Sequence, residues 1–536
     1  MWTSAASAAP PTVANPLCPT EVVFYDPGQG QDIVVPKGYK VSVFVSGLNF
    51  PTGIAFRQIG NQGNQGDNND QGEDGDWNKK AKNFEVYILE SGHGLPSICN
   101  DETKLPAAKN PFTPDILVFD QHGVLQRILG KPTDTTSETG GTNVFQPHGP
   151  SVDIAFEKGL KGGRLFATDS NQATHAHNGQ NNSSRIVTVD PGTGKVTPFI
   201  SQLPTGDHPT EQLAFKDGWI YWSQGSTTNS GVVGRDNGGG ANQPDIPCQD
   251  IVLSKNVFDS GGGVFTSGYS PFGTTRPGAT VKAFEGASHH GVCDGAILRA
   301  QLNAQDPSKT SEPFSWGYRN GYAIRFAPKK HPLEGGLLVG EDGADERGAR
   351  PSNNAPDPLQ LAKQNKDGTP DYHGWPDRYG FLPTSQSVYN PVGGPGDDLC
   401  VPDPTNLPSM CTVASVKQIQ TEDAPLRDVL DHPPQQITSP LAIEAADSSF
   451  TGIDFVPDSF VVANGPVARG AAMYILEGDF GFSASNSAPP FPLKCDSSTT
   501  PPGVCDEIGH EAKIINFSPE GAPLKILRFA KNKNND

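Results

Sequence analysis

Histidine, arginine and carboxylate side chains return at matching places along this chain of 536 residues. His148, His208 and the pair Arg319–Asn320 each precede a short apolar segment. Acidic residues close a second apolar segment, and these are Glu90, Asp169, Glu341, Asp342, Glu477 and Asp479. An imidazole can accept a proton, and a guanidinium can stabilise a developing negative charge. If the fold brings these places together, the sequence predicts a site for acid–base chemistry on a small polar substrate.

These segments belong to an internal repeat with five visible copies. The first copy pairs Phe50-Pro-Thr-Gly-Ile-Ala-Phe56 with Val86-Tyr-Ile-Leu-Glu90, and the others begin near residues 148, 208, 319 and 450. Residues 115–129 and 185–200 read as third and fourth strands. Four short strands per copy are typical of an all-β propeller, in which neighbouring blades must stack to bury their faces. A β-sandwich with coincidental similarity is the alternative.

A propeller would gather the polar residues at one place. The first strand of each blade lines the central channel, and the second strand returns antiparallel beside it. The loop that enters the first strand therefore opens on the same face as the loop that leaves the second. We expect the histidines, Arg319–Asn320 and the strand-ending carboxylates to converge around one mouth of the channel, which is the default place for a binding site.

The repeat also sets the predicted domain organisation. Residues 1–36 read as an N-terminal extension, and residues 37–536 read as a single propeller domain with loop insertions at 60–83 and 376–449. Tyr39-Lys-Val-Ser-Val-Phe-Val45 precedes the first copy and predicts an orphan outermost strand. The segment Lys525-Ile-Leu-Arg-Phe529 reads as the fourth strand of the fifth copy.

Composition excludes several classes of protein. The formal net charge of −19 argues against nucleic acid as a partner. Glycine and proline make up about a fifth of the chain, which suits a turn-rich β protein. No stretch approaches the roughly 18 apolar residues of a membrane-spanning helix. The motifs of P-loop nucleotide binding, zinc proteases and α/β-hydrolases are absent from the sequence.

The eight cysteines are even in number and lack the spacing of zinc or redox sites. We predict disulfides between Cys400 and Cys411 and between Cys495 and Cys505, which bracket short loops. Two further predicted pairs are Cys248–Cys293 and Cys18–Cys99. Disulfides favour a secreted or periplasmic protein.

The segment Glu341-Asp-Gly-Ala-Asp-Glu346 is dense in carboxylates, which need a cation, hydrogen bonds or water around them. Hard oxygen ligands of this kind favour calcium over zinc. His175, His177 and the pair His289–His290 are alternative metal ligands, and exposed loop histidines are the simpler interpretation of them.

Several of these motifs together resemble the glucose/sorbosone dehydrogenase family of soluble quinoproteins. The similar phrases are Trp316-Gly-Tyr-Arg-Asn320, Glu341-Asp-Gly-Ala-Asp-Glu-Arg347 and Tyr372-His-Gly-Trp-Pro376, in that order, with Asp207–His208 before a strand. The resemblance covers roughly residues 37–376 and more weakly the chain from Phe450. It implies a six-bladed propeller that holds pyrroloquinoline quinone and Ca²⁺.

The resemblance also implies roles for single residues. His208 matches the general base that takes a hydroxyl proton while a hydride passes to the quinone. Arg319 and Asn320, with His148 at the equivalent place of an earlier copy, are the expected quinone contacts. Backbone carbonyls of Gly343, Ala344 and Tyr372 are the expected calcium ligands.

The sequence departs from the family beside the base. Ser226 stands where the family has the aspartate that orients this histidine, so Glu211 or Asp207 must take that part. The C-terminal basic residues that the family uses for the carboxylates of its quinone have no comparable cluster here.

The sequence therefore predicts a quinone-dependent dehydrogenase (EC 1.1 class) that oxidises a sugar, another polyol or an alcohol, with an electron acceptor that the sequence does not name. A calcium-dependent hydrolase of the lactonase type and a non-catalytic propeller that binds carbohydrate or protein are the alternatives.

Overall fold

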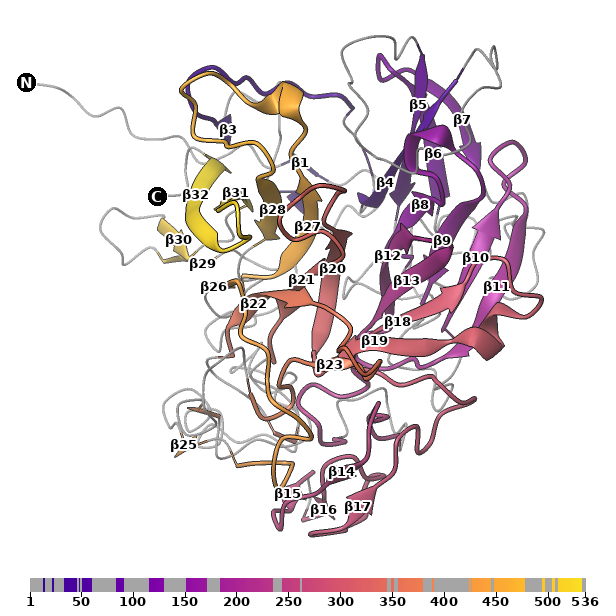
Figure 1. The fold of residues 1–536 in the computed structure, drawn as a ribbon, viewed down its shortest axis with the longest axis vertical. Coiled ribbons are helices and arrows are strands. Elements are labelled where there is room, and N and C mark those ends of the chain that lie inside the picture. Colours follow the sequence, from indigo (N-terminus) through magenta and orange to yellow (C-terminus); the bar gives the residue numbers. More distant parts are fainter. Residues whose placement is uncertain are drawn as a thin grey trace, which may run out of the picture.

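A computed structural model describes part of the chain, namely residues 13–14, 22–23, 33–45, 48, 51–59, 83–90, 115–129, 151–170, 184–234, 243–260, 263–344, 349–350, 355–378, 388–389, 424–425, 427–444, 448–477, 494–496, 504–506 and 510–532. Within these residues the regular elements are strands and short 3₁₀ turns, without an α-helix. The fold is an all-β propeller, as the repeat predicts (Figure 1).

Each repeat copy forms one blade whose first two strands are the predicted ones. Blade one consists of β4 (Pro51–Gln58), β5 (Phe84–Glu90), β6 (Asp115–Asp120) and β7 (Leu125–Leu129). Blade two consists of β8 (Ile154–Phe156), β9 (Leu165–Asp169), β10 (Ser184–Val189) and β11 (Val196–Leu203). Blade three consists of β12 (Thr210–Lys216), β13 (Trp219–Gln224), β18 (Ala296–Gln301), β19 (Glu312–Trp316) and β23 (Asp371–Tyr372).

The last two blades draw strands from distant parts of the chain. Blade four consists of β20 (Asn320–Phe326), β21 (Leu337–Asp342), β22 (Asp357–Ala362) and β26 (Ala442–Glu444). Blade five consists of β27 (Phe450–Phe455), β28 (Ala472–Glu477), β31 (His510–Phe517), β32 (Pro523–Asn532) and β3 (Ile33–Val34). The described residues thus form five blades, as the visible copies indicate, and not the six that the family resemblance implies.

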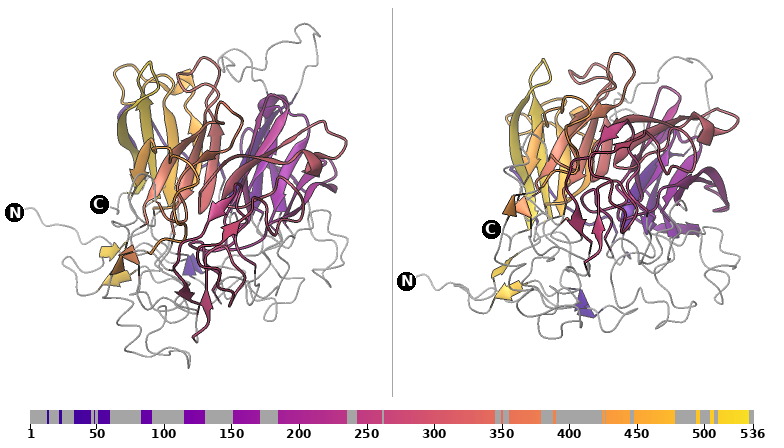
Figure 2. Two further views of the ribbon diagram at one scale, coloured as in Figure 1. Left: turned by 60° about the horizontal axis from the view of Figure 1, so that its bottom comes forward. Right: turned by 90° about the horizontal axis from the view of Figure 1, so that it is seen from below.

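Successive blades meet along their first strands. Contacts join β4 to β8, β8 to β12, β12 to β20 and β20 to β27. The second strands lie within the stack and are buried on both sides, so they read as continuous apolar runs such as Val86-Tyr-Ile-Leu89. The outer strand β7 is mostly exposed instead, and only Leu129 at its end is buried. Figure 2 shows the blades standing next to one another.

The predicted orphan strand at Tyr39–Val45 is wrong. The N-terminal pairing is made by β3, in which Ile33 lies opposite Asn532 of β32. The Tyr39 ring then packs on Phe529 of blade five, with ring centroids 4.8 Å apart. Further along, the Phe44 ring lies 6.3 Å from that of Phe119 in blade one. The segment therefore runs from the last blade to the first and contributes side-chain packing where the sequence pattern suggested a strand.

Insertions add small hairpins at the margin of the blades. Blade three carries β14 (Ile251–Val252) paired with β17 (Thr280–Val281), and β15 (Phe258–Asp259) paired with β16 (Phe265–Thr266). This insertion projects beyond the blades in Figure 2. Three more hairpins are β1 (Val13–Ala14) with β2 (Val22–Val23), β24 (Val388–Tyr389) with β25 (Ala424–Pro425), and β29 (Lys494–Asp496) with β30 (Val504–Asp506).

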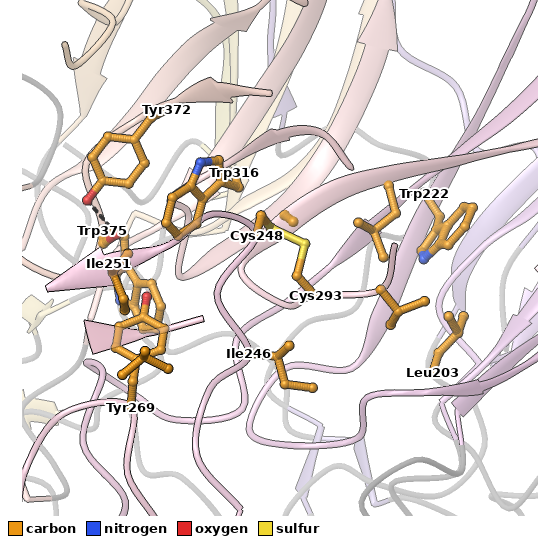
Figure 3. Packing of buried hydrophobic residues seen from close by; sticks show 14 of the residues in the cluster. Leu203, Trp222, Ile246, Cys248, Ile251, Tyr269, Cys293, Trp316, Tyr372 and Trp375 are labelled. Atoms are coloured by element: carbon orange, nitrogen blue, oxygen red, sulfur yellow. Dashed lines mark hydrogen bonds between the residues drawn. A yellow bond between two sulfur atoms is a disulfide. The ribbon is translucent and has the colours of Figure 1, made fainter. Parts of the chain in front are cut away.

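The predicted Cys248–Cys293 disulfide is confirmed. Figure 3 shows it within the largest apolar cluster, near Ile246 and between Trp222 and Trp316. Cys18, Cys99, Cys400 and Cys411 lie outside the described residues. Cys495 and Cys505 lie opposite each other in the β29–β30 ladder. Their side chains are outside the description, so that disulfide stays a prediction.

A search of the described elements finds no helix long and apolar enough to cross a membrane.

Candidate functional site

The strand register places the predicted site residues at one end of their blades. Asn320, which begins β20, lies opposite Asp342, which ends β21. The same holds in blade three, where Thr210 opposes Gln224, and in blade five, where Phe450 opposes Leu476. We call this end of the blades the mouth. His148 and Asp479 of the predicted set lie outside the described residues.

One carboxylate joins the two groups that the sequence assigns to different roles. Asp207 Oδ2 lies 3.5 Å from His208 Nε2 and 3.6 Å from Arg319 Nη2. The side chains of Asp207 and Arg319 are 5% and 4% exposed, whereas that of His208 is 21% exposed. The imidazole is therefore the least buried side chain of this unit, although its Nε2 atom is itself buried. We call Asp207, His208 and Arg319 the base unit.

The structure resolves which residue accompanies the base. Ser226 accepts a hydrogen bond from the His208 backbone N–H at 3.0 Å. The Ser226 hydroxyl itself donates to the Thr228 carbonyl oxygen at 2.6 Å, away from the imidazole. Of the two candidates that the sequence left open, Asp207 is the one within contact distance of the His208 ring.

The acidic turn of blade four lies directly beside Arg319. The Arg319 backbone N–H donates to Glu341 Oε1 at 2.9 Å, and Gln360 Nε2 donates to Glu341 Oε2 at 3.2 Å. Asn320 Nδ2 donates to Asp342 Oδ2 at 3.2 Å. The other oxygen of Asp342 accepts the backbone N–H of Phe450 at 2.6 Å, which ties blade four to blade five.

Burial changes the acidity of these carboxyl groups. Glu211 is buried, and that burial raises its pKa to about 8. Burial raises the pKa of Glu341 to about 8 too, and the nearby charge of Asp357 adds to the effect. The pKa of Asp342 is likewise raised, first by burial and then by Asp357. At neutral pH Glu211 and Glu341 are therefore mainly in the neutral, protonated form.

Two buried acceptor oxygens of the mouth have no hydrogen-bond donor among the described residues. These are Glu211 Oε2 and Asn320 Oδ1. Asp342 lies close to both residues, because it accepts from Asn320 and its pKa is raised by the charge of Glu211. Buried polar atoms are usually paired, so this spot suits a ligand that donates hydrogen bonds.

The predicted calcium ligands all lie within the described residues, and the structure gives hydrogen bonds of Gly343 and Tyr372. The Gly343 N–H donates to Asp357 Oδ1 at 2.6 Å, which closes the Gly343–Ala344 turn. The Tyr372 carbonyl oxygen accepts the Thr438 N–H at 3.1 Å. Its side chain packs in the apolar cluster beside Trp316 (Figure 3). Within the described residues no group of three or more His, Cys, Asp or Glu could hold a metal ion, so calcium stays a prediction.

Sequence reasoning missed the parts of Asp357 and Gln360. Asp357 accepts from Gly343 and, at 2.7 Å, from the Ser449 N–H, so it links the acidic turn to blade five. Gln360 holds Glu341 in place. Both residues belong to β22, the third strand of its blade. An alignment of the first residues of the third strands could have pointed to Asp357, because it begins β22 as Asp115 begins β6.

Comparisons with known proteins add little beyond the fold. No family model matches the chain, and no curated protein matches it. Among solved structures, a variant of the apocarotenoid oxygenase from Synechocystis is 10% identical over 84% of this chain, with a TM-score of 0.25. The cobalt-substituted form of that oxygenase has 10% identity and a TM-score of 0.26.

A putative 6-phosphogluconolactonase from Bacteroides uniformis is 13% identical over 61% of this chain and 85% of its own length, with a TM-score of 0.18. The chain covers 58% of the oxygenase. Similarities this weak carry no argument about activity.

Proposed function

We propose that this protein is a quinoprotein-like dehydrogenase that oxidises a hydroxyl group of a sugar or other polyol, with His208 as the general base. The observation that supports it most is the single carboxylate of Asp207 between His208 and Arg319. The family resemblance assigns these two residues to the base and to the quinone contact. Their contact with one carboxylate brings the proton acceptor and the expected cofactor contact together.

In this proposal His208 accepts the proton of the substrate hydroxyl as the C–H hydride leaves. Its ring is the least buried member of the base unit. Protonation creates an imidazolium ion, and the buried carboxylate of Asp207 stabilises that positive charge. Glu211 Oε2 and Asn320 Oδ1 are acceptors that suit the further hydroxyl groups of a polyol.

Pyrroloquinoline quinone, when bound, supplies the hydride acceptor. Its carboxylates make it anionic, so the charge of the mouth is the relevant fit test. Burial raises the pKa of Glu211 and Glu341 to about 8, so these two carboxyl groups cancel little of the Arg319 charge at neutral pH, and Asp207 is the carboxylate that pairs with it. Arg319 would then hold the quinone, with Asn320 next to it in the chain. In this proposal Ca²⁺ would be bound at the Gly343–Ala344 turn and Tyr372.

The buried Cys248–Cys293 disulfide supports an oxidising compartment, so secretion or export to a periplasm is part of this proposal.

A lactonase-type hydrolase is the second candidate. A high-pKa carboxyl group and a partly exposed imidazole at one mouth could act as acid and base on water and an ester without a redox cofactor. This candidate predicts lactone hydrolysis that does not require quinone.

Dye-linked oxidation separates the two candidates. The purified protein is loaded with pyrroloquinoline quinone and Ca²⁺ and given a panel of sugars, polyols and lactones. The dehydrogenase predicts dye reduction that requires the quinone. Lactone hydrolysis without quinone would favour the second candidate. Absence of both activities would favour a propeller that only binds carbohydrate or protein.

A further inference from the structure

The loop Gly225–Thr228, directly after β13, is bonded to all three residues of the base unit. Ser226 O accepts the His208 N–H at 3.0 Å, and the Ser226 N–H donates to Arg319 O at 2.8 Å. Thr227 O accepts the Asp207 N–H at 3.1 Å. These three hydrogen bonds therefore fix the backbone of the base unit relative to this loop.

The backbone of this loop packs closely against the backbone of the base unit. A Cβ atom at Gly225 would lie 2.2 Å from the Cβ of His208, and one at Gly206 would lie 2.4 Å from the Cα of Thr227. Real Cβ atoms do not approach so closely, so the two backbones touch here because both positions are glycine. A shift of the loop must move His208 and Asp207 with it.

Two buried aspartates hold the loop from the other side. The Thr227 hydroxyl donates to Asp294 Oδ2, while Asp294 Oδ1 accepts the Ile246 N–H at 2.8 Å. Thr228 donates to Asp245 through its N–H at 2.9 Å and through its hydroxyl at 2.6 Å. Asp245 and Asp294 are 1% and 2% exposed.

Both aspartates stand at the ends of the insertion that the disulfide closes. Asp294 follows Cys293, and Asp245 lies three residues before Cys248. The insertion is anchored in the apolar cluster of Figure 3 through Ile246 and the disulfide itself. The hydrogen bond between the Thr227 hydroxyl and the Asp294 carboxylate connects this anchored insertion to the loop that contacts the base unit.

We propose that Thr227 and Asp294 are positioning residues: their hydrogen bond sets the alignment of Asp207 with His208, and the disulfide-closed insertion is thereby a working part of the active site. This inference rests on the proposed function for its kinetic test. Neither residue touches the substrate in this account, and both act through Asp207 and His208.

The first test compares Thr227→Val, which removes the hydroxyl and keeps the shape, with Thr227→Ser, which keeps the hydroxyl. The kcat of quinone-linked oxidation is expected to fall about 10- to 100-fold in Thr227→Val, because small displacements of catalytic groups are costly. KM should change by less than about twofold, and Thr227→Ser should recover most of the rate. A wild-type kcat and pH profile in Thr227→Val would overturn the proposal.

Thr193→Val is the matched control. The Thr193 hydroxyl donates to Asp190 at 2.8 Å in an exposed turn of blade two, so this variant also loses a threonine–aspartate hydrogen bond. It should leave kcat unchanged. If Thr227→Val does not fold, Asp294→Asn takes its place, because it keeps the size of the side chain and removes one acceptor oxygen. The same loss of kcat is expected.

An activity-independent measurement separates this inference from the proposed function. The His208 imidazole is titrated by NMR, with its signal assigned from the His208→Ala spectrum. Asp207 contacts the ring, and Arg319 contacts the same carboxylate. In Thr227→Val its titration midpoint should fall by at least about half a pH unit, because the imidazolium loses an aligned carboxylate. Thr227→Ser should titrate as wild type. An unmoved midpoint in Thr227→Val overturns the positioning role, even if the protein oxidises nothing.

Discussion

Two buried glutamates at opposite ends of the blades have opposite acidities. Glu85 in blade one receives hydrogen bonds from Arg127 at 2.6 Å, from Tyr87 at 2.7 Å and from Arg57 at 2.6 Å. Burial raises its pKa, but these three partners outweigh it and lower the pKa to about 2. Glu211 at the mouth is buried without such partners, and its pKa is raised to about 8.

The difference distinguishes a structural cluster from a candidate site. Arg127 also donates to the Pro191 carbonyl oxygen at 3.0 Å, so the Glu85 cluster joins blade one to the hairpin of blade two. Among the described residues, the mouth instead contains buried hydrogen-bond acceptors that lack a donor and carboxyl groups with few positively charged partners. Burial without compensation lowers stability, and proteins concentrate it where they bind or react. Changes at the mouth should therefore alter activity or raise stability, and changes at Glu85 should lower stability.

His208→Ala should have the largest effect. Removal of the base is expected to lower kcat by about 10²- to 10⁴-fold, since general-base catalysis contributes rates of that order. The free energy of unfolding should stay close to wild type because the ring is partly exposed. Kinetics of quinone-linked oxidation and denaturant unfolding of the same preparation check both halves. An unchanged kcat would remove His208 from the proposed mechanism.

Asp207→Asn is expected to lower kcat about 10- to 100-fold, because the amide neither orients nor charges the imidazole as the carboxylate does. The basic side of the activity optimum should be retained, while the acidic limb moves to lower pH as the pKa of His208 falls. A pH–rate profile measures this. A profile identical to wild type would show that another group orients the base.

Glu85→Gln should leave kcat unchanged and lower stability by about 2 kcal/mol at pH 7, the order of hydrogen bonds to a charged group. The pKa of Glu85 falls from 4.5 in the unfolded chain to about 2 in the folded one. Its contribution is therefore present above about pH 4.5 and is lost as pH falls toward 2. Urea unfolding of both proteins across that range should show the curves converging at low pH.

Glu211→Gln should change stability in the opposite direction from Glu85→Gln. The pKa of Glu211 rises from 4.5 to about 8 on folding, so the wild type loses stability as pH rises between these values. The neutral amide removes that loss. At pH 8 the variant should be more stable by about 4 kcal/mol, since the pKa rises from 4.5 to about 8 and one pKa unit corresponds to about 1.4 kcal/mol. Equal stability of the two proteins at pH 8 would contradict the raised pKa.

The sequence predicted the strands that repeat and missed those that do not. The first and second strands of all blades carry the repeat, and the second strands carry the clearest apolar runs because they are buried between neighbours. By contrast, β26 (Ala442–Glu444) has three residues and comes from the predicted 376–449 insertion, too short for any periodicity. The parallel pairing of β23 with β19 likewise has no local signal.

The sequence predicted where the candidate-site residues lie in the fold, but it did not predict which of them contact one another. Repeat alignment located His208, Arg319 and Asn320 at strand starts, and the register places Asn320 there directly. The choice of Asp207 over Glu211 depends on the loop Gly225–Thr228. That loop is set by a bond between Thr227 and Asp294, which are 67 residues apart. Contacts over that distance leave no trace in local spacing.

Thermal unfolding with and without pyrroloquinoline quinone, each in the presence of Ca²⁺ or a chelator, tests the central claim most directly. Wild-type protein and Arg319→Gln are compared. A ligand at a hundred times its Kd stabilises the folded state by about 2.7 kcal/mol. Quinone with Ca²⁺ is expected to raise the Tm of the wild type by a few degrees, and Arg319→Gln should lose most of this rise. No rise in the wild type, or an equal rise in the variant, would contradict a quinone site beside the His208–Asp207 pair.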